Sequence, residues 1–378
     1  MGTSDVLMLL GGLALFLYGM QMMSSGLEAA AGNRMKTILE KLTSNRVKGV
    51  LVGAGITAVI QSSSATTVMV VGFVSAGLMT LNQAVWVIMG ANIGTTITGQ
   101  LIALDVSAIA PLITFFGVVM MVFLKNEKAQ HLGNIIAGLG VLFIGMNMMS
   151  TAMEPLQDST VFTSLITKFD NPLVGILAGA VFTALIQSSS ASVGILQALA
   201  ASGVLGLPQA VYVLFGQNIG TCITAVLASI GTKVNAKRST IIHLMFNIIG
   251  TFLFTCICMA TPFVLWMEGL TPGNTVAQIA NVHTVFNIVT TLLLLPFGNL
   301  MAKAATKILP GGEEEEEEAH KLIYLEPIDG RKTRQVGQIS VSIKQLDNEI
   351  ARMFDLVWQN VKDGFDAVIT RKCSKMEH

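Results

Sequence analysis

Two short polar segments in an otherwise apolar sequence carry side chains that could bind a ligand. The sequence QSSSA occurs at residues 61–65 and again at residues 187–191, an offset of 126. Serine hydroxyls and glutamine carboxamides both donate and accept hydrogen bonds. No charged residue occurs in 49–104 or in 173–232. A site built from these segments must therefore use neutral groups.

A helix that breaks at each QSSS segment would give this neutral site a partial positive charge from the N-terminus of the helix that follows. The first N–H groups of a helix have no partner within the helix, and the N-terminus carries a partial positive charge. Two such N-termini that converge form a cradle for an anion. The serines at which these helices would begin are Ser63, Ser64, Ser189 and Ser190.

The same helix breaks would also provide oxygen ligands for a cation. The carbonyl groups at the ends of the preceding helices, with side-chain oxygens of nearby amides, suit a hard monovalent cation such as Na⁺. These amides belong to Gln61, Asn92, Gln187 and Asn218. A dianion in a dehydrated site without Arg or Lys is costly unless something neutralises it. Bound Na⁺ would do so, and the two affinities would then be linked, which is the basis of symport.

The composition predicts a membrane-embedded body followed by a short polar tail. Hydrophobic residues make up 52% of the chain and charged residues 12%, whereas soluble domains contain about 25% charged residues. Residues 310–378 hold 24 of the 46 charged residues. This distribution excludes a soluble enzyme domain and a disordered chain. It also excludes a nucleic-acid-binding protein, which needs a basic face.

We expect neither an enzyme nor a bound cofactor. A serine nucleophile needs a positioned base, and the sequence has no phosphate-binding loop, paired carboxylates or metal-ligand cluster. His243 and His283 each begin a His-x-x-Phe-Asn element. These histidines either line the ligand site or hold the helices beside it. The alternative is that they form interhelical hydrogen bonds without a role in binding.

The chain is a tandem duplication. Residues 12–98 and 138–224, aligned without gaps, are identical at 36 of 87 positions. A second motif, Gly-x-Asn-Ile-Gly-Thr, occupies residues 90–95 and 216–221 at the same offset. Small residues such as serine also promote packing of membrane helices, which would explain a single serine run. The recurrence of two polar motifs at one offset favours a binding site.

Seven stretches are long and apolar enough to cross a membrane, which takes about 20 residues. They are residues 6–27, 83–104, 106–124, 131–153, 209–230, 239–266 and 277–300. Two further stretches, 47–80 and 173–206, have QSSS near their centres. We expect each to form a re-entrant hairpin, because non-helical backbone at membrane depth needs protein or a watery cavity around it. A single kinked span is the alternative.

The predicted fold is an all-α polytopic membrane protein of two inverted-topology repeats, residues 1–130 and 131–305. Each repeat contributes three crossings and a QSSS-tipped hairpin, and an extra helix ends the second repeat. With the N-terminus outside, the inner loops hold twelve Lys and Arg residues and the outer loops one. The positive-inside rule thus places the C-terminal tail in the cytoplasm. Inverted repeats with broken helices are typical of transporters.

The paired QSSS segments, the paired Gly-x-Asn-Ile-Gly-Thr motifs and the His-x-x-Phe-Asn elements resemble the sodium–phosphate cotransporter family. That family contains the type II Na⁺/phosphate cotransporters and their bacterial relatives. The resemblance covers about residues 5–305 and is to the bacterial members. It implies symport of inorganic phosphate and Na⁺ across the bacterial inner membrane. It also implies an elevator-like motion of the hairpins against a scaffold, with the lipid bilayer as surroundings.

The resemblance further implies which residues bind each substrate. The phosphate ligands would be Ser62, Ser63, Ser64, Thr66, Ser188, Ser189, Ser190 and Ser192. The Na⁺ ligands would be Gln61, Ser63, Asn92, Thr95, Gln187, Ser189, Asn218 and Thr221. The two copies are not chemically equivalent, because Val193 replaces Thr67 and Cys222 replaces Thr96. The first copy has more hydroxyls to offer as sodium ligands.

Three other functions stay open on the sequence. A neutral site of hydroxyls and amides would also suit sulfate or a dicarboxylate. The cytoplasmic tail would suit a phosphate-signalling or scaffold membrane protein with little flux. An anion channel would pass current without any dependence on sodium.

The polar tail consists of a Gly/Glu-rich linker, residues 306–334, and an amphipathic helix within residues 335–378. Its apolar stripe follows helical spacing through Ile339, Ile343, Leu346, Ile350, Met353, Val357 and Val361. This segment is similar to the opening helix of the phosphate-uptake regulator PhoU but is too short for a full helical bundle. One helix cannot bury such a stripe alone, so a homodimer is one arrangement that would cover it.

Overall fold

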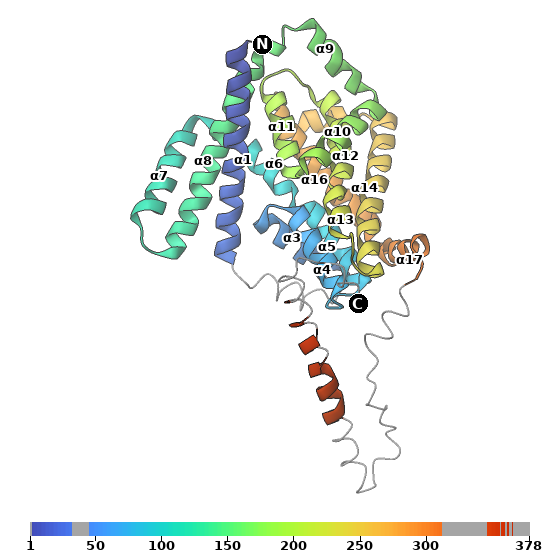
Figure 1. Cartoon of the computed structure of the whole chain (residues 1–378). Helices are drawn as coiled ribbons and strands as arrows, with labels where there is room; N and C mark the ends of the chain where they lie inside the picture. The colour runs from blue at the N-terminus through green and yellow to red at the C-terminus, as the bar shows by residue number, and fades with distance from the viewer. Residues whose placement is uncertain are drawn as a thin grey trace. The chain divides into compact units, whose positions relative to one another are not determined.

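The computed structural model describes residues 2–31 and 45–311 and, in the tail, 346–355, 357–359, 361–362 and 365. All regular secondary structure in these ranges is helical. The chain divides into two compact units, Met1–Pro310 and Gly311–His378. The first unit contains both copies of the duplicated sequence (Figure 1).

The first unit has the helices of a multi-pass membrane protein. Six described segments are long and apolar enough to cross a membrane: Thr3–Ala31, Leu81–Ala103, Glu127–Leu156, Leu207–Ala228, Val234–Ala260 and Thr275–Ile308. They match six of the seven expected spans. The seventh expected span, 106–124, is shorter and consists of the 3₁₀ turn η1 (Ser107–Ile109) and helix α7 (Ala110–Phe123). One bent pair, Thr160–Asp170 with Pro172–Ile186, would be the seventh crossing if it counts as one span.

Helices α1 (Thr3–Ala31) and α7 flank helix α8 (Glu127–Met153) in a three-helix group (Figure 1). The crossing of α1 and α8 is so close that a side chain on Gly19 would collide with the backbone of Leu142. Small residues allow this approach between membrane helices.

Both QSSS segments interrupt a helix. In the first copy α3 (Arg46–Ile60) ends and α4 (Ser63–Ser75) begins, and in the second copy α10 (Pro172–Ile186) ends and α11 (Ser189–Ala201) begins. The glutamine at each break, Gln61 or Gln187, has left-handed backbone angles (φ 60°, ψ 22°), which end the preceding helix.

The serine after each glutamine caps the next helix. The side chains of Ser62 and Ser188 accept hydrogen bonds from the N–H groups of Ala65 and Ala191, at 3.1 and 3.2 Å. Serine is among the strongest N-cap residues because it satisfies one of the free N–H groups of the first turn. The residue order Gln-Ser therefore produces the same stop and start in both copies.

In each copy a second helix is interrupted at a single threonine, Thr95 or Thr221, whose backbone angles stay right-handed helical. In the first copy α5 (Leu81–Gly94) is followed by α6 (Thr96–Ala103), and in the second copy α12 (Leu207–Gly220) is followed by α13 (Cys222–Ala228). Helix α3 packs on α5, and α10 packs on α12. The two copies therefore fold into the same order of helices.

The helices after the second copy pack against both copies. They are α14 (Val234–Ala260), α15 (Phe263–Leu270), α16 (Thr275–Leu294) and α17 (Gly298–Ile308). The ring of Phe215 on α12 lies 5.9 Å from that of Phe254 on α14 and 5.1 Å from that of Phe286 on α16. All three rings are fully buried. This aromatic cluster fixes α14 and α16 beside the second copy.

The described part of the tail contains a helix over residues 346–355. It lies within the predicted amphipathic helix and carries an ion pair between Arg352 and Glu349. The apolar side chains of Leu346, Ile350 and Met353 are about half exposed within this unit. Val357 and Val361 of the predicted stripe are described and are also exposed, whereas most of the predicted linker and most other residues of the predicted tail lie outside the described residues.

Candidate functional site

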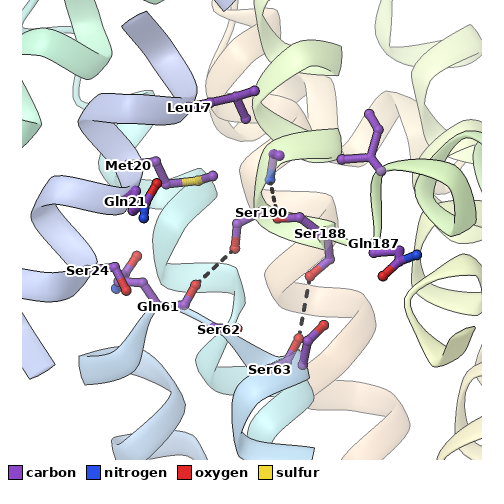
Figure 2. Close-up of a pocket in the computed structure, with 14 residues that line it drawn as sticks. Leu17, Met20, Gln21, Ser24, Gln61, Ser62, Ser63, Gln187, Ser188 and Ser190 are labelled. Carbon is purple, nitrogen blue, oxygen red and sulfur yellow. Dashed lines mark hydrogen bonds between the residues drawn. The ribbon is translucent and has the colours of Figure 1, made fainter. Parts of the chain in front are cut away.

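The two QSSS segments line one cavity of about 350 Å³. Its wall consists of residues 61–64 of the first copy, residues 186–191 of the second copy, and four side chains of α1: Leu17, Met20, Gln21 and Ser24. Figure 2 shows Gln61, Ser62 and Ser63 on one side of the cavity and Ser188 and Ser190 on the other. The expected meeting of the two segments is therefore present in the structure.

Two helix N-termini face each other at this cavity. The hydroxyl oxygens of Ser63, the first residue of α4, and Ser189, the first residue of α11, lie 3.4 Å apart. Both serines are buried. Because the first N–H groups of each helix lack partners in that helix, both positive helix ends are directed to one place. Such an arrangement can hold an anion without a cationic side chain.

The carboxamide of Gln61 has partners at both of its polar atoms. Its Oε1 accepts a hydrogen bond from Thr98 Oγ1 at 2.7 Å, and its Nε2 donates to the carbonyl of Ala58. The backbone carbonyl of Gln61 accepts a hydrogen bond from Ser190 Oγ at 3.3 Å. The hydroxyls of Thr98 and Ser190 also lie 3.2 Å apart. The second copy therefore touches the helix break of the first copy directly.

The equivalent glutamine in the second copy has a different environment. Gln187 is exposed, whereas only 5% of Gln61 is exposed. Thr224 occupies the position equivalent to Thr98, but its hydroxyl donates to Ser64 Oγ at 3.1 Å. The carboxamide of Gln187 is consequently free to turn toward a ligand, and the cavity is chemically asymmetric.

Thr66 and Ser192 do not reach the cavity wall. Thr66 Oγ1 accepts a hydrogen bond from Thr57 Oγ1 at 2.9 Å. Ser192 is fully buried, and its hydroxyl has no hydrogen-bond partner among the described residues. Both residues lie one helical turn beyond the cavity-lining serines, behind the helix N-termini.

Of the residues expected to bind a cation, Thr95 lies next to the paired serines. Its Oγ1 is 3.4 Å from Ser189 Oγ. Asn92, Asn218 and Thr221 are buried and lie outside the cavity wall. The hydroxyl of Thr221 has no partner among the described residues, so it has an oxygen available for another ligand.

Each of the two asparagines contacts one of the two histidines of the His-x-x-Phe-Asn elements. His243 Nε2 lies 3.4 Å from Asn92 Oδ1, and His283 Nε2 lies 3.3 Å from Asn218 Oδ1. Both contacts are interhelical, as one of the sequence interpretations expected.

Three polar residues of the site were missed by the sequence analysis. Gln21 and Ser24 come from α1, and the Ser24 hydroxyl donates to the carbonyl of Ile60 at 2.5 Å. Thr98 comes from the turn after the break between α5 and α6. A signal for them exists in the sequence at the 126-residue offset, where Ser24 and Thr98 recur as Ser150 and Thr224 and Gln21 is replaced by another amide, Asn147.

The sequence profile of the Na⁺/Pi-cotransporter family matches residues 15–151 and again residues 144–270. The chain belongs to the Na⁺/Pi-cotransporter family. The resemblance drawn from the QSSS segments is thereby confirmed. Each of the two matches contains one QSSS segment, in line with the duplication.

Individual relatives agree with membership of the Na⁺/Pi-cotransporter family. The uncharacterized protein YqeW of Bacillus subtilis is 35% identical over 298 residues, which cover 78% of this chain and 95% of YqeW. YjbB of Salmonella typhimurium, named as a proposed inorganic phosphate export protein, is 28% identical over 311 residues. That alignment covers 80% of this chain and 56% of YjbB, so the chain spans only about half of this relative.

A human relative extends the comparison to the sodium-dependent members. Sodium-dependent phosphate transport protein 2B is 32% identical over 191 residues, which cover 47% of this chain and 28% of the human protein. No solved structure matches the chain.

Proposed function

We propose that this protein is a secondary transporter that carries inorganic phosphate across the membrane together with Na⁺. The observation that carries the proposal is the meeting of two serine-capped helix N-termini at one cavity, with Ser63 and Ser189 in contact at 3.4 Å. The names of relatives support the choice of phosphate and Na⁺, since they include phosphate export and sodium-dependent phosphate transport proteins.

Phosphate would bind between the two helix N-termini. Its oxygens would accept hydrogen bonds from N–H groups of the first turns of α4 and α11 and from serine hydroxyls. The phosphate-binding hydroxyls would be those of Ser62, Ser63, Ser64, Ser188, Ser189 and Ser190. Thr66 and Ser192 lie behind these residues and would support the helix ends.

Sodium ions would neutralise the anion in a site that has no cationic side chain. Hydroxyl and carboxamide oxygens are suitable hard ligands for Na⁺. The Na⁺ ligands would come from Gln61, Ser63, Asn92, Thr95, Gln187, Ser189, Asn218 and Thr221. Each bound ion offsets the charge of the other. The affinity for phosphate would therefore rise with the Na⁺ concentration, and the affinity for Na⁺ would rise with the phosphate concentration.

The transport cycle would use the duplicated architecture. Residues 1–130 and 131–305 would form inverted repeats whose QSSS segments are the tips of re-entrant hairpins entering from opposite faces of the bacterial inner membrane. The N-terminus would be outside and the tail in the cytoplasm, where a second protomer could cover its apolar stripe. An elevator-like motion would carry the hairpins past the group of α1, α7 and α8, which contributes Gln21 and Ser24 to the cavity wall.

Uptake of radiolabelled phosphate into proteoliposomes tests this proposal. An inward Na⁺ gradient should drive accumulation, and replacement of Na⁺ by K⁺ should abolish it. Competition by arsenate without competition by sulfate would support phosphate as the substrate. Sulfate or dicarboxylate accumulation would identify another carrier, and sodium-independent current would identify a channel. No flux of any of these anions by folded protein would favour the signalling or scaffold function.

The direction of net transport follows from the gradients in this proposal. A symporter moves its substrates in whichever direction their combined gradients favour, so export by a relative such as YjbB is compatible with the same site. Proteoliposomes loaded with phosphate and Na⁺ should release phosphate when external Na⁺ is removed.

A further inference from the structure

The two His-x-x-Phe-Asn elements form matching contacts with the two copies of the duplication. His243 on α14 contacts Asn92 of the first copy, and His283 on α16 contacts Asn218 of the second copy. Asn92 and Asn218 are equivalent at the 126-residue offset. At most 2% of either histidine is exposed, so neither side chain is in contact with solvent.

Each of these two helices also contacts the other copy, two turns further along. On α14 the hydroxyl of Thr251 donates to the carbonyl of Phe215 in the second copy, at 3.2 Å. On α16 the hydroxyl of Thr291 donates to the carbonyl of Met89 in the first copy, at 3.4 Å. Met89 and Phe215 are again equivalent at the offset of 126.

The histidine and threonine contacts have the same pattern on α14 and on α16, except that the two copies of the duplication exchange places. The histidine and the threonine are eight residues apart on both α14 and α16. On α14 the histidine contacts copy one and the threonine copy two, and on α16 the assignment is reversed. Accidental packing would not be expected to repeat this pattern, so α14 and α16 act as a matched pair that ties α5 to α12.

The polarity of the histidine contacts follows from the groups involved. A carboxamide oxygen only accepts hydrogen bonds, so the tautomer with its proton on Nε2 donates to Oδ1 in each pair. One turn after Asn92 is Thr95, whose hydroxyl lies 3.4 Å from Ser189 Oγ at the cavity. The contact of His243 with Asn92 is thus one helical turn away from the contact of Thr95 with the paired serines.

We propose that His243 and His283 are positioning residues of the transport site. Each fixes the asparagine at the break of α5 or α12 and thereby orients the oxygens expected to bind Na⁺, without touching the substrates themselves. The inference rests on the proposed Na⁺-coupled phosphate transport and adds two residues to its machinery. It predicts that replacement of either histidine changes the Na⁺ dependence of phosphate uptake, in addition to any effect on the stability of the protein.

The test compares variants that keep or remove the donor. Glutamine places an N–H donor near the position of histidine Nε2, and leucine fills the space without a donor. Phosphate uptake by reconstituted His243→Leu and His283→Leu should need about three- to tenfold more Na⁺ for half-maximal rate, the range expected for one lost hydrogen bond. His243→Gln and His283→Gln should return within about twofold of the wild type on the same scale. His131→Leu on α8 is the matched control and should leave the Na⁺ dependence unchanged.

Two further comparisons keep the test decisive. If a leucine variant fails to fold, His243→Asn, whose donor is too short to reach Asn92, takes its place. Thr251→Val removes a bond on the same helix without affecting the histidine, so it should lower the melting temperature and leave the Na⁺ dependence unchanged. Folded leucine or asparagine variants with wild-type Na⁺ dependence, or glutamine variants no better than leucine, would overturn the inference alone. Wild-type uptake without any Na⁺ dependence would overturn the proposed function as well.

Discussion

Ser63 and Ser189 place their hydroxyl oxygens 3.4 Å apart, although 126 residues separate them in the chain. Each is the first residue of a helix that follows a left-handed glutamine and a capping serine. The contact therefore brings two equivalent helix N-termini together. A duplicated sequence produces such a site from one local motif, because each copy supplies half of it.

Removal of either paired hydroxyl should impair transport. For Ser63→Ala and Ser189→Ala we expect at least tenfold slower phosphate uptake, because a hydrogen bond to a charged ligand is worth about 1.5–3 kcal/mol. Both variants should remain folded, since alanine is smaller than serine and favours helices. Uptake at limiting phosphate, measured in proteoliposomes, provides the comparison.

Ser164→Ala is the matched control for this pair. Ser164 is exposed on α9 (Thr160–Ile166), and its hydroxyl donates to the carbonyl of Val161. Its replacement should leave uptake within about twofold of the wild type, as expected for a surface substitution. Equal activity of Ser63→Ala, Ser189→Ala and Ser164→Ala would contradict the site.

Thr98 should affect phosphate uptake indirectly, because its hydroxyl holds the carboxamide of Gln61. Thr98→Val keeps the shape of the side chain and removes the donor to Gln61 Oε1, which leaves a buried carboxamide oxygen without its 2.7 Å partner. We expect phosphate uptake to fall about three- to tenfold, the effect of one lost hydrogen bond. Thr98→Ser retains the hydroxyl and should preserve most activity. If valine and serine behave alike, Thr98 acts through packing and not through its hydroxyl.

The left-handed backbone at Gln187 gives a prediction about stability. Glycine adopts these angles without a Cβ penalty, whereas a residue with a side chain pays about 1–2 kcal/mol. Gln187→Gly should therefore melt at or above the wild-type temperature, while Gln187→Val should melt lower. Because the carboxamide is lost in both variants, both should bind Na⁺ more weakly. Identical melting temperatures would show that the helix break does not constrain this residue.

Two glycines on α3 should respond differently to the same substitution. A Cβ on Gly53 would collide with the carbonyl of Val87 on α5, whereas a Cβ on Gly55 would meet nothing within 4 Å. Gly53→Ala should cost about 1–3 kcal/mol through overpacking. Gly55→Ala should be neutral or stabilising, because alanine favours helices. Thermal unfolding in detergent separates them, and equal melting would contradict the close packing of α3 on α5.

The helix breaks were predictable because their causes are local. Glutamine in a left-handed conformation and a capping serine act within a few residues, so the sequence QSSS predicts where α4 and α11 begin. The offset of 126 residues predicts that the two segments are equivalent. The contact of Gln61 with Thr98 and Ser190 is not local, and nothing in either motif specifies it.

The contribution of α1 could not be read from a motif. Gln21 and Ser24 lie in a long apolar helix, and only the packing of α1 beside the first helix break, where Ser24 donates to the carbonyl of Ile60, brings them to the cavity. Likewise, hydropathy predicts the position of a span at residues 106–124 but not its length, because the segment consists of the 3-residue turn η1 and the 14-residue helix α7. Together these cover roughly 27 Å, which is at the lower limit for the hydrocarbon core of about 30 Å.

The most direct test of the account is equilibrium binding of radiolabelled phosphate to purified protein, in Na⁺ and in K⁺. The account predicts saturable binding by the wild type in Na⁺, at least tenfold weaker binding in K⁺, and loss of the Na⁺-dependent binding in both Ser63→Ala and Ser189→Ala. Binding that is equal in the two salts, or that persists in both folded serine variants, would contradict a phosphate and Na⁺ site between the two helix N-termini.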